Sequence, residues 1–340
     1  MRAALMQRGK IWVDEVVTPQ PGPGEVLVKS LACGICGSDL HAAQHTEAFV
    51  ETSREAGGAF KLTTFEPVVL GHEFCAEVVE YGADTTRALK PGTAVCSIPV
   101  LSRQAGLPIG YSDEVHGGFA EYFLLSERFL LPVPQGTSAH TAAMTEPMAV
   151  GLHAVRRAGL GGHEAVLVLG CGPVGLAVVT NLKAIGVEPI IAADYSPGRR
   201  AFAELQGAAL SVDPKSADPF DHPDLKKPEN VVIFECVGVP GMLDHIYLGA
   251  PQNARIVVVG VCLQMDHARP LIAVNKELNV QYVLGYSVKE FKETLEHIAD
   301  GSFSTEALIT AKIGLDEVAS AFDTLRSPDH HAKIVVQPGA

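Results

Sequence analysis

The sequence feature that most constrains the fold is the segment from Ala165 to Asp194, which reads as strand, glycine-rich turn, helix and second strand. The apolar run 165–169 ends in Gly170-Cys171-Gly172-Pro173-Val174-Gly175, and a second run, 189–193, closes on the aspartate. A Gly-x-Gly-x-x-Gly pattern alone is weak evidence. A strand before it, a helix after it and an acid further on give it the context of a dinucleotide-binding unit. The segment therefore predicts α/β architecture with a Rossmann, doubly wound parallel sheet.

Each turn residue has a task in this interpretation. Gly170 permits the tight turn, Gly172 lets the backbone approach a pyrophosphate, and Gly175 allows the helix to pack closely on the strand. Pro173 and Val174 begin the helix, whose free N–H groups would bind the phosphates.

The residues after the second strand bear on the choice of cofactor. Asp194 would accept hydrogen bonds from the adenosine ribose hydroxyls and repel a 2'-phosphate, which favours NAD over NADP. Arg199 and Arg200 leave NADP open, since either arginine can pair with a 2'-phosphate. We expect NAD.

The chain beyond this unit repeats the α/β pattern. The continuous apolar runs 231–238 and 255–261 are typical of parallel strands covered on both faces. Their carboxyl ends predict walls for a nicotinamide ring, at Val237, Gly260 and Val261. The segment 211–229 is rich in Asp, Pro and Lys and is expected to be a solvated surface loop, whereas 278–284 is expected to be a further strand. A helix over 291–301 and a strand over 333–338 should follow.

The first part of the chain has a different pattern. Short β segments between turns are expected at 26–30, 77–81, 94–96 and 117–125, and no long helix is expected before the one that begins at Glu146. A β-rich domain is therefore predicted ahead of the parallel sheet.

Residues 33–41, Cys-Gly-Ile-Cys-Gly-Ser-Asp-Leu-His, are the motif on which the chemistry depends. A Cys-x-x-Cys pair alone can be a redox couple, half of a zinc site or two buried small residues. Gly-His-Glu at 71–73 adds an imidazole and a carboxylate. One thiolate, one imidazole and carboxylates are the mixed ligand set of a catalytic zinc with an open coordination position.

Four motifs in order carry a family resemblance: residues 33–41, Gly-His-Glu at 71–73, Glu-Pro-Met-Ala-Val at 146–150 and the glycine-rich turn at 170–175. The chain resembles the zinc-dependent medium-chain alcohol dehydrogenases over essentially its full length, and within them the sorbitol and butanediol dehydrogenase branch. The resemblance implies a GroES-like β-rich catalytic domain, 1–150 and 286–340, with a Rossmann NAD-binding domain, 151–285, inserted within it.

The resemblance also implies roles for single residues. It makes Cys36 and His72 zinc ligands, places Glu146 at a third ligand position, and gives Glu73 as a carboxylate that is a direct ligand in some members. Ser38 matches the hydroxyl that takes the proton of the alcohol, and His41 the group that passes it on through the cofactor ribose. For these reasons the expected catalytic residues are Cys36, Ser38, His41, His72 and Glu146.

Two departures from the family pattern lead to predictions. Many members hold a structural zinc with four closely spaced cysteines, whereas 96–116 contains Cys96 alone, so we expect one zinc per chain. The interval from Cys36 to His72 is longer than usual. The extra segment, 46–66, contains Phe49, Phe60 and Phe65 and is hypothesised to form a lid or wall of the substrate pocket, with a decorative surface loop as the alternative.

Composition excludes several classes of partner and compartment. A formal net charge of −13 argues against nucleic acid and anionic membranes. The amino terminus does not resemble a signal peptide, and the apolar run 165–179 is too short for a membrane span. Seven cysteines, an odd number, do not suggest a disulfide framework, so a reducing cytoplasm is expected.

The predicted activity is hydride transfer between a secondary alcohol, diol or polyol and NAD, giving the ketone. The alternatives are a zinc-free quinone or enoyl reductase of the same fold, a dehydrogenase of amino alcohols of the L-threonine type, and a non-catalytic NAD-sensing or crystallin-like protein. The alternating apolar residues of 278–284 at an expected sheet edge also predict a homodimer or homotetramer.

Overall fold

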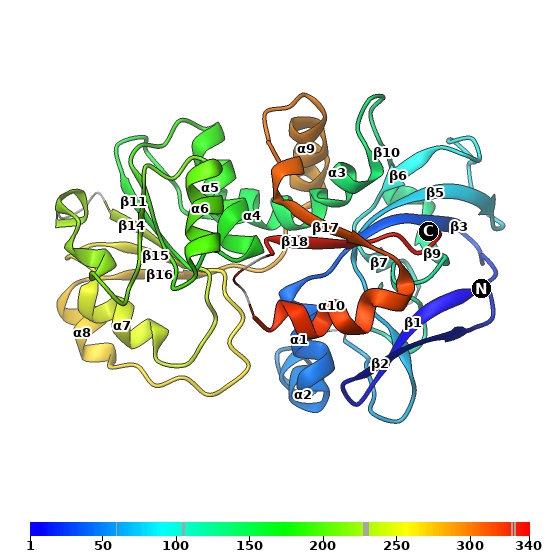
Figure 1. Ribbon diagram of the computed structural model, residues 1–340, viewed down its shortest axis with the longest axis horizontal. Helices are drawn as coiled ribbons and strands as arrows, with labels where there is room; N and C mark the ends of the chain where they lie inside the picture. The colour runs from blue at the N-terminus through cyan, green and yellow to red at the C-terminus, as the bar shows by residue number, and fades with distance from the viewer. Residues whose placement is uncertain (59, 104–105, 227–230, 328, 330) are drawn as a thin grey trace.

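A computed structural model describes residues 1–58, 60–103, 106–226, 231–327, 329 and 331–340. Two large sheets lie towards opposite ends of the long axis of the molecule, and α4 and α9 lie between them (Figure 1). The helices along the chain are α1 Gly37–Gln44, α2 Thr46–Glu55, α3 Ala139–Ala143, α4 Thr145–Arg157, α5 Pro173–Ala184, α6 Pro197–Leu205, α7 Met242–Gly249, α8 Pro270–Asn275, α9 Val288–Ala299 and α10 Val318–Leu325.

One large sheet is parallel throughout, with the strand order β13-β12-β11-β14-β15-β16. Its strands are β11 Ala165–Leu169, β12 Ile190–Ala193, β13 Leu210–Val212, β14 Val231–Glu235, β15 Arg255–Val258 and β16 Asn279–Tyr282. From β11 the chain runs outward through β12 to β13. It then crosses over to β14, on the other side of β11, and continues outward through β15 to β16. This switch next to β11 creates a crevice at the carboxyl ends of the strands.

Alternation along β11 explains how both faces of the parallel sheet are covered. Val166 and Val168 belong to an apolar cluster with residues of α4 and α5, whereas Leu167 and Leu169 belong to a second cluster with residues of α7. A strand buried on both sides has no polar face, and this accounts for its uninterrupted apolar sequence.

The other large sheet has the order β10-β6-β5-β3-β18-β17, with β9 also paired to β3. Its strands are β3 Glu25–Gly34, β5 Glu73–Tyr81, β6 Ala94–Cys96, β9 Tyr122–Ser126, β10 Leu131–Pro132, β17 Ile309–Ile313 and β18 Lys333–Val336. A smaller sheet, β2-β1-β4, and a pair, β7 with β8, complete this part, with bounds Arg2–Gln7 for β1, Lys10–Glu15 for β2, Val68–Val69 for β4, Val100–Leu101 for β7 and Leu107–Pro108 for β8.

The carboxyl-terminal strand returns to the amino-terminal part of the chain. β18 pairs antiparallel with β3, with Val335 opposite Gly34 and Val336 opposite Cys33. The β-rich sheet is therefore built from both ends of the chain, as the predicted insertion of one domain into another requires. The domain limits at 150/151 and 285/286 stay a prediction; the first of them falls inside α4.

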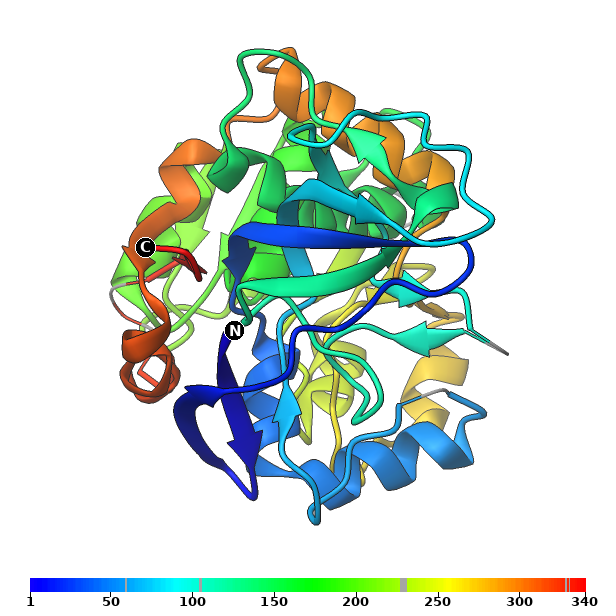
Figure 2. The ribbon, with the colours of Figure 1, turned by 90° about the vertical axis from the view of Figure 1, so that its right-hand side faces the viewer.

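Two sequence predictions were wrong, and the bounds of a predicted strand were too wide at its start. Two helices, α1 and α2, lie in the segment where only β structure was expected, and Figure 2 shows them at the lower edge of the β-rich end. The strand predicted over 117–125 forms at Tyr122–Ser126. The described part of 211–229 is not a solvated loop, because Phe220 and Leu225 are buried there against the parallel sheet. Residues 227–229 lie outside the described part.

None of the helices that the structure describes is both long and apolar enough to cross a lipid bilayer.

Candidate active site

The glycine-rich turn joins β11 to α5 and depends on two glycines. Gly170 has a φ of 88°, in the left-handed region, and a Cβ there would lie 2.8 Å from the Val237 side chain. A Cβ on Gly175 would lie 1.8 Å from the carbonyl oxygen of Gly170, so only glycine lets α5 pack so closely on the turn. Gly172 is the N-cap of α5, and Pro173 begins the helix. The free N–H groups of this helix end can bind a phosphate.

Asp194 lies beside the same turn, at the end of β12. Its Oδ2 accepts a hydrogen bond from the Cys171 N–H at 2.8 Å, and its Oδ1 accepts one from the Ser196 N–H at 2.8 Å. The Nη1 atom of Arg199 lies 3.9 Å from Oδ2. The buried Nε of Arg199 has no hydrogen-bond partner among the described residues. One carboxylate therefore ties the second strand to the turn, with a guanidinium next to it.

The predicted nicotinamide walls lie where β14 and β15 end. Val237 and Val261 are 40% and 48% exposed, and Gly260 approaches Gly238 so closely that a Cβ would lie 2.4 Å from the Gly238 nitrogen. Glu235, which the sequence analysis did not single out, accepts hydrogen bonds from Val237 at 2.7 Å and from Gly238 at 2.8 Å. The sequence signal that could have identified Glu235 is its position as the acidic last residue of an otherwise apolar strand.

A pocket with a volume of about 200 Å³ separates these strand ends from the β-rich part of the chain. His41, His45 and Ala48 line one side, from α1 and α2. Residues 238–240 and 262–264 line the other. The cleft between the two sheets is thus bordered by the loops expected to contact a nicotinamide and by one residue of the predicted proton relay.

Three buried or half-buried donor groups converge on the β-rich side: Cys36, His72 and Glu73. One ligand atom from each lies within 4.8 Å of the others, and among the described residues no other such group of His, Cys, Asp or Glu is found. Cys36 is the N-cap of α1, directly after β3, and Glu73 begins β5, paired with Gly34 of β3. Adjacent antiparallel strands therefore bring together residues that are 36 positions apart.

Asp39 contacts two of these residues with one carboxylate. Its Oδ2 accepts a hydrogen bond from the Cys36 N–H at 2.9 Å, and its Oδ1 lies 3.3 Å from Nδ1 of His72. The geometry at Nδ1 is not that of an aligned hydrogen bond, and neither atom has another partner among the described residues. Burial lowers the pKa of His72, but Asp39 and Cys36 outweigh it and raise the pKa well above its usual value. The Asp39 carboxylate therefore lies on the Nδ1 side of the imidazole and in contact with the backbone of Cys36.

Glu73 is held by a lysine that the sequence analysis did not identify. Both of its carboxylate oxygens lie 2.7 Å from Nζ of Lys333, which also donates to the Ile35 carbonyl at 3.1 Å. A Cβ on Gly34 would lie 2.1 Å from Oε2 of Glu73, so the carboxylate uses space that only glycine leaves open. The residues next to Lys333 in the sequence do not indicate that it pairs with Glu73.

Glu146 lies in the first turn of α4, outside the group of three. Its Oε1 accepts a hydrogen bond from the Tyr286 hydroxyl at 2.8 Å. Burial raises the pKa of Glu146 to about 7, with His72 opposing that shift and Glu73 adding to it. Glu146 therefore belongs to the same electrostatic neighbourhood, with Tyr286 as a partner that the sequence analysis missed.

The two predicted relay residues lie on α1. Ser38 accepts a hydrogen bond from the Tyr111 hydroxyl at 2.7 Å, and His41 faces the pocket. Among the hydrogen bonds of the described residues, none joins Ser38 to His41. Burial and the neighbouring His45 lower the pKa of His41.

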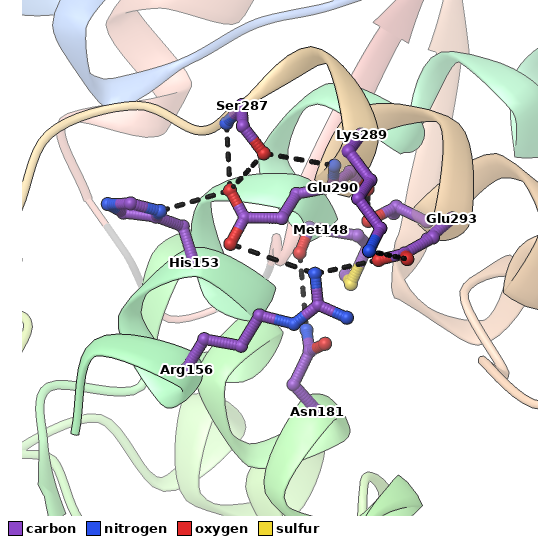
Figure 3. Close-up of polar contacts among 9 residues, drawn as sticks. Met148, His153, Arg156, Asn181, Ser287, Lys289, Glu290 and Glu293 are labelled. Atoms are coloured by element: carbon purple, nitrogen blue, oxygen red, sulfur yellow. Dashed lines mark hydrogen bonds and ion pairs between the residues drawn. The ribbon is translucent and has the colours of Figure 1, made fainter. Parts of the chain in front are cut away.

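A polar cluster fixes the start of α9, next to Tyr286 (Figure 3). Glu290 accepts from Ser287 in a capping box and lies 3.1 Å from Nδ1 of His153 on α4. Arg156, one turn further along α4, pairs with Glu293 at 2.7 Å. These contacts join α4, which carries Glu146, to α9, which begins shortly after Tyr286.

Comparisons with known proteins agree with this arrangement. Residues 22–135 match the alcohol dehydrogenase GroES-like domain, and residues 173–300 match the zinc-binding dehydrogenase domain. The (R,R)-butanediol dehydrogenase of Bacillus subtilis (strain 168) is 33% identical, over 99% of this chain and 100% of that protein. The chain belongs to the zinc-dependent medium-chain dehydrogenase/reductase family. The family resemblance seen in the sequence is thus confirmed.

Further relatives place the chain in the sorbitol and butanediol dehydrogenase branch of this family. The sorbitol dehydrogenase of Bos taurus is 28% identical over 93% of this chain and 90% of that protein. The crystal structure of 2R,3R-butanediol dehydrogenase from Bacillus subtilis has a TM-score of 0.84 at 32% identity, covering 99% of both chains. A structure from Sinorhizobium meliloti 1021 with bound NADP has the same TM-score at 28% identity and the same coverage. The predicted fold, with its GroES-like and Rossmann parts, is confirmed.

Proposed function

We propose that this protein oxidises a vicinal diol or another secondary alcohol to the ketone, with zinc and NAD as cofactors. The observation that carries the proposal is the convergence of Cys36, His72 and Glu73 in a chain that also contains a dinucleotide-type turn at the start of α5. Family membership supports the same reaction class.

The donor set suits zinc. A thiol, an imidazole and a carboxylate are ligands that Zn²⁺ accepts, and three protein ligands leave a position for substrate. Asp39, with an otherwise unpartnered oxygen next to His72, supplies the outer hydrogen-bonding shell of such a site. When bound, zinc would polarise the alcohol oxygen and stabilise its developing negative charge. Glu146 is proposed as a further carboxylate of the site, available to the metal if its bond to Tyr286 is exchanged.

The residues of the chain then move protons and hold the reactants. Ser38 is proposed to accept the proton of the substrate hydroxyl, and His41, which faces the pocket, to pass a proton towards solvent. Val237, Gly260 and Val261 are proposed to form one wall for the nicotinamide, so that the hydride of the alcohol carbon transfers across the cleft.

NAD is favoured as the cofactor by Asp194, whose carboxylate is fixed beside the turn and would repel a 2'-phosphate. The phosphates of the cofactor are proposed to lie against Gly172, Pro173 and Val174, with Arg199 contributing positive charge.

Diols and polyols are favoured over simple alcohols by the names of the most similar relatives, which are butanediol and sorbitol dehydrogenases. The experiment is a panel of 2,3-butanediol stereoisomers, sorbitol, L-threonine and simple secondary alcohols, with NADH formation as the readout and C36S as the inactive control. Activity that is greatest with a diol or polyol supports the proposal. Activity greatest with L-threonine, or equal activity in the variant, would contradict it.

We also propose a homodimer or homotetramer in a reducing cytoplasm. β16 is an edge strand of the parallel sheet, and Tyr282 and Leu284 are 62% and 89% exposed on or next to it. Exposed apolar sheet edges are usually covered, and a second copy of the chain would do so. All seven cysteines are free thiols, as expected in that compartment.

A further inference from the structure

An aromatic stack connects the extra segment 46–66 to the candidate metal site. The rings of Phe49 and Phe60 are stacked, with centroids 4.9 Å apart and an interplanar angle of 3°. Both contact the ring of Tyr111, at 5.6 Å and 4.8 Å. Tyr111 in turn packs on His72 at 5.0 Å. The stack therefore runs from the surface helix α2 to a candidate metal ligand.

The backbone reinforces this connection. Lys61 donates its N–H to the Tyr111 carbonyl at 2.9 Å and accepts from the Asp113 N–H at 3.3 Å. Thr46 at the start of α2 bonds through its hydroxyl to the Ala42 carbonyl on α1, the helix that carries Ser38. The segment is thus joined to α1 at its beginning and to the backbone around Tyr111 near its end.

The polar end of Tyr111 meets Ser38. The ring is buried, with 6% of the residue exposed, and the hydroxyl donates to Ser38 Oγ at 2.7 Å. A serine hydroxyl has one O–H to donate and two positions that can accept. The Tyr111 hydroxyl occupies one accepting position of Ser38 Oγ. The other accepting position stays available for an incoming proton, and the serine keeps a single O–H to donate.

We propose that Tyr111 is a positioning residue that fixes the Ser38 hydroxyl for proton transfer, and that the segment 46–66 holds Tyr111 in place. This inference rests on the proposed function. During oxidation Ser38 accepts the proton of the substrate O–H and releases its own proton on the side of His41, while the hydride leaves the alcohol carbon for NAD. Without Tyr111 the hydroxyl rotates and often points the wrong way, so the proton step becomes slower.

The test compares Tyr111→Phe with Tyr81→Phe. Tyr81 is a matched control, since its hydroxyl also makes one bond, to the Leu89 carbonyl at 2.7 Å, away from the site. Positioned proton transfer contributes about 10²- to 10⁴-fold in enzymes, so losing its orientation should lower kcat of Y111F on the order of tenfold. The KM for NAD should not change, and the solvent deuterium isotope effect on kcat should rise. A crystal structure of Y111F should show Ser38 in a changed or mixed rotamer.

A second pair of variants tests the role of the segment. Phe60→Ala removes a ring of the stack, whereas Phe65→Ala removes a ring that is 77% exposed in the same segment. F60A should share the kinetic signature of Y111F and F65A should not. An active wild type whose kcat, isotope effect and Ser38 rotamer are unchanged in Y111F overturns the inference. A wild type without any alcohol oxidation overturns the proposed function instead.

Discussion

Lys333 and Glu73 form a buried ion pair across 260 positions of the chain, with Nζ 2.7 Å from each carboxylate oxygen and 1% exposure of both side chains. The pair links β18 to β5 beside Cys36, and so connects the return of the carboxyl terminus to the candidate metal site. Burial lowers the pKa of Lys333, but Glu73 and Cys36 outweigh it and raise the pKa. The lysine is therefore charged and compensates part of the negative charge of the site.

Replacing Lys333 should lower the free energy of unfolding strongly. In metal-free protein, Lys333→Met leaves the Glu73 carboxylate buried without its partner, and such losses destabilise proteins by about 3–5 kcal/mol. The free energy of unfolding, measured in urea, should fall accordingly. Lys183→Met is the control, because Lys183 pairs with Glu188 at a similar 2.8 Å but both side chains are at least half exposed. Its loss should stay below about 1 kcal/mol. Equal losses in the two variants would show that the buried pair is not structural.

The zinc content of the protein should depend on Cys36, His72 and Glu73. Elemental analysis is expected to find one zinc per chain in the wild type and much less in Cys36→Ser or His72→Ala, because two remaining ligands bind zinc weakly. Cys262→Ser, at a cysteine outside the group, is the control and should keep its zinc. Two zincs per chain, or full zinc in the Cys36 variant, would contradict the assignment.

Cofactor choice should depend on the charge of Asp194. Asp194→Asn keeps one oxygen, which can accept from one of the two backbone N–H groups that now bond to the carboxylate, and removes the charge that repels a 2'-phosphate. The ratio of kcat/KM for NAD to that for NADP should fall about tenfold or more, which corresponds to about 1.4 kcal/mol. Asp213→Asn, which lies 3.5 Å from Arg200 and does not contact the turn, is the control. An unchanged ratio in D194N would mean that Arg199 and Arg200 decide the selection.

Glu164 should make stability depend on pH below neutrality. Burial would raise its pKa, but hydrogen bonds from the Gly161 N–H, the Arg255 guanidinium and the His163 N–H lower it from 4.5 to about 2. A carboxyl whose folded pKa is depressed stabilises the fold above its unfolded pKa, and this contribution disappears as pH falls from about 5 towards 2. The melting temperature of Glu164→Gln should therefore be lower than that of the wild type at pH 7, and the gap should narrow on acidification. If the difference between the two melting temperatures widened as the pH falls, the predicted direction of the pH dependence would be wrong.

Local patterns predicted the parallel sheet well because its strands are short, apolar and separated by glycines. The strand at 165–169 of this sheet was predicted to the residue, as was the strand at 94–96 of the β-rich sheet. The helices α1 and α2 were missed because they have eight and ten residues, too few for a clear helical period, and because α1 starts inside the metal-ligand motif with Cys36 as its N-cap.

The partners of the site residues could not be predicted in the same way. Tyr111, Tyr286 and Lys333 lie 73, 140 and 260 positions from the residues that they contact. Nothing in the residues next to them indicates a role, because only the completed sheets bring them to the site. Cys33, the first cysteine of the Cys-x-x-Cys pair, is fully buried and lies outside the group of three donors.

The most direct test of the proposed zinc-dependent oxidation is the rate of NADH formation with the best diol of the panel, before and after chelation, on protein of known zinc content. The rate should fall to background when the zinc is removed and return when zinc is added back, and C36S should not recover. A rate that persists in fully demetallated protein would contradict the account, and the site around Cys36 and His72 would then not be catalytic.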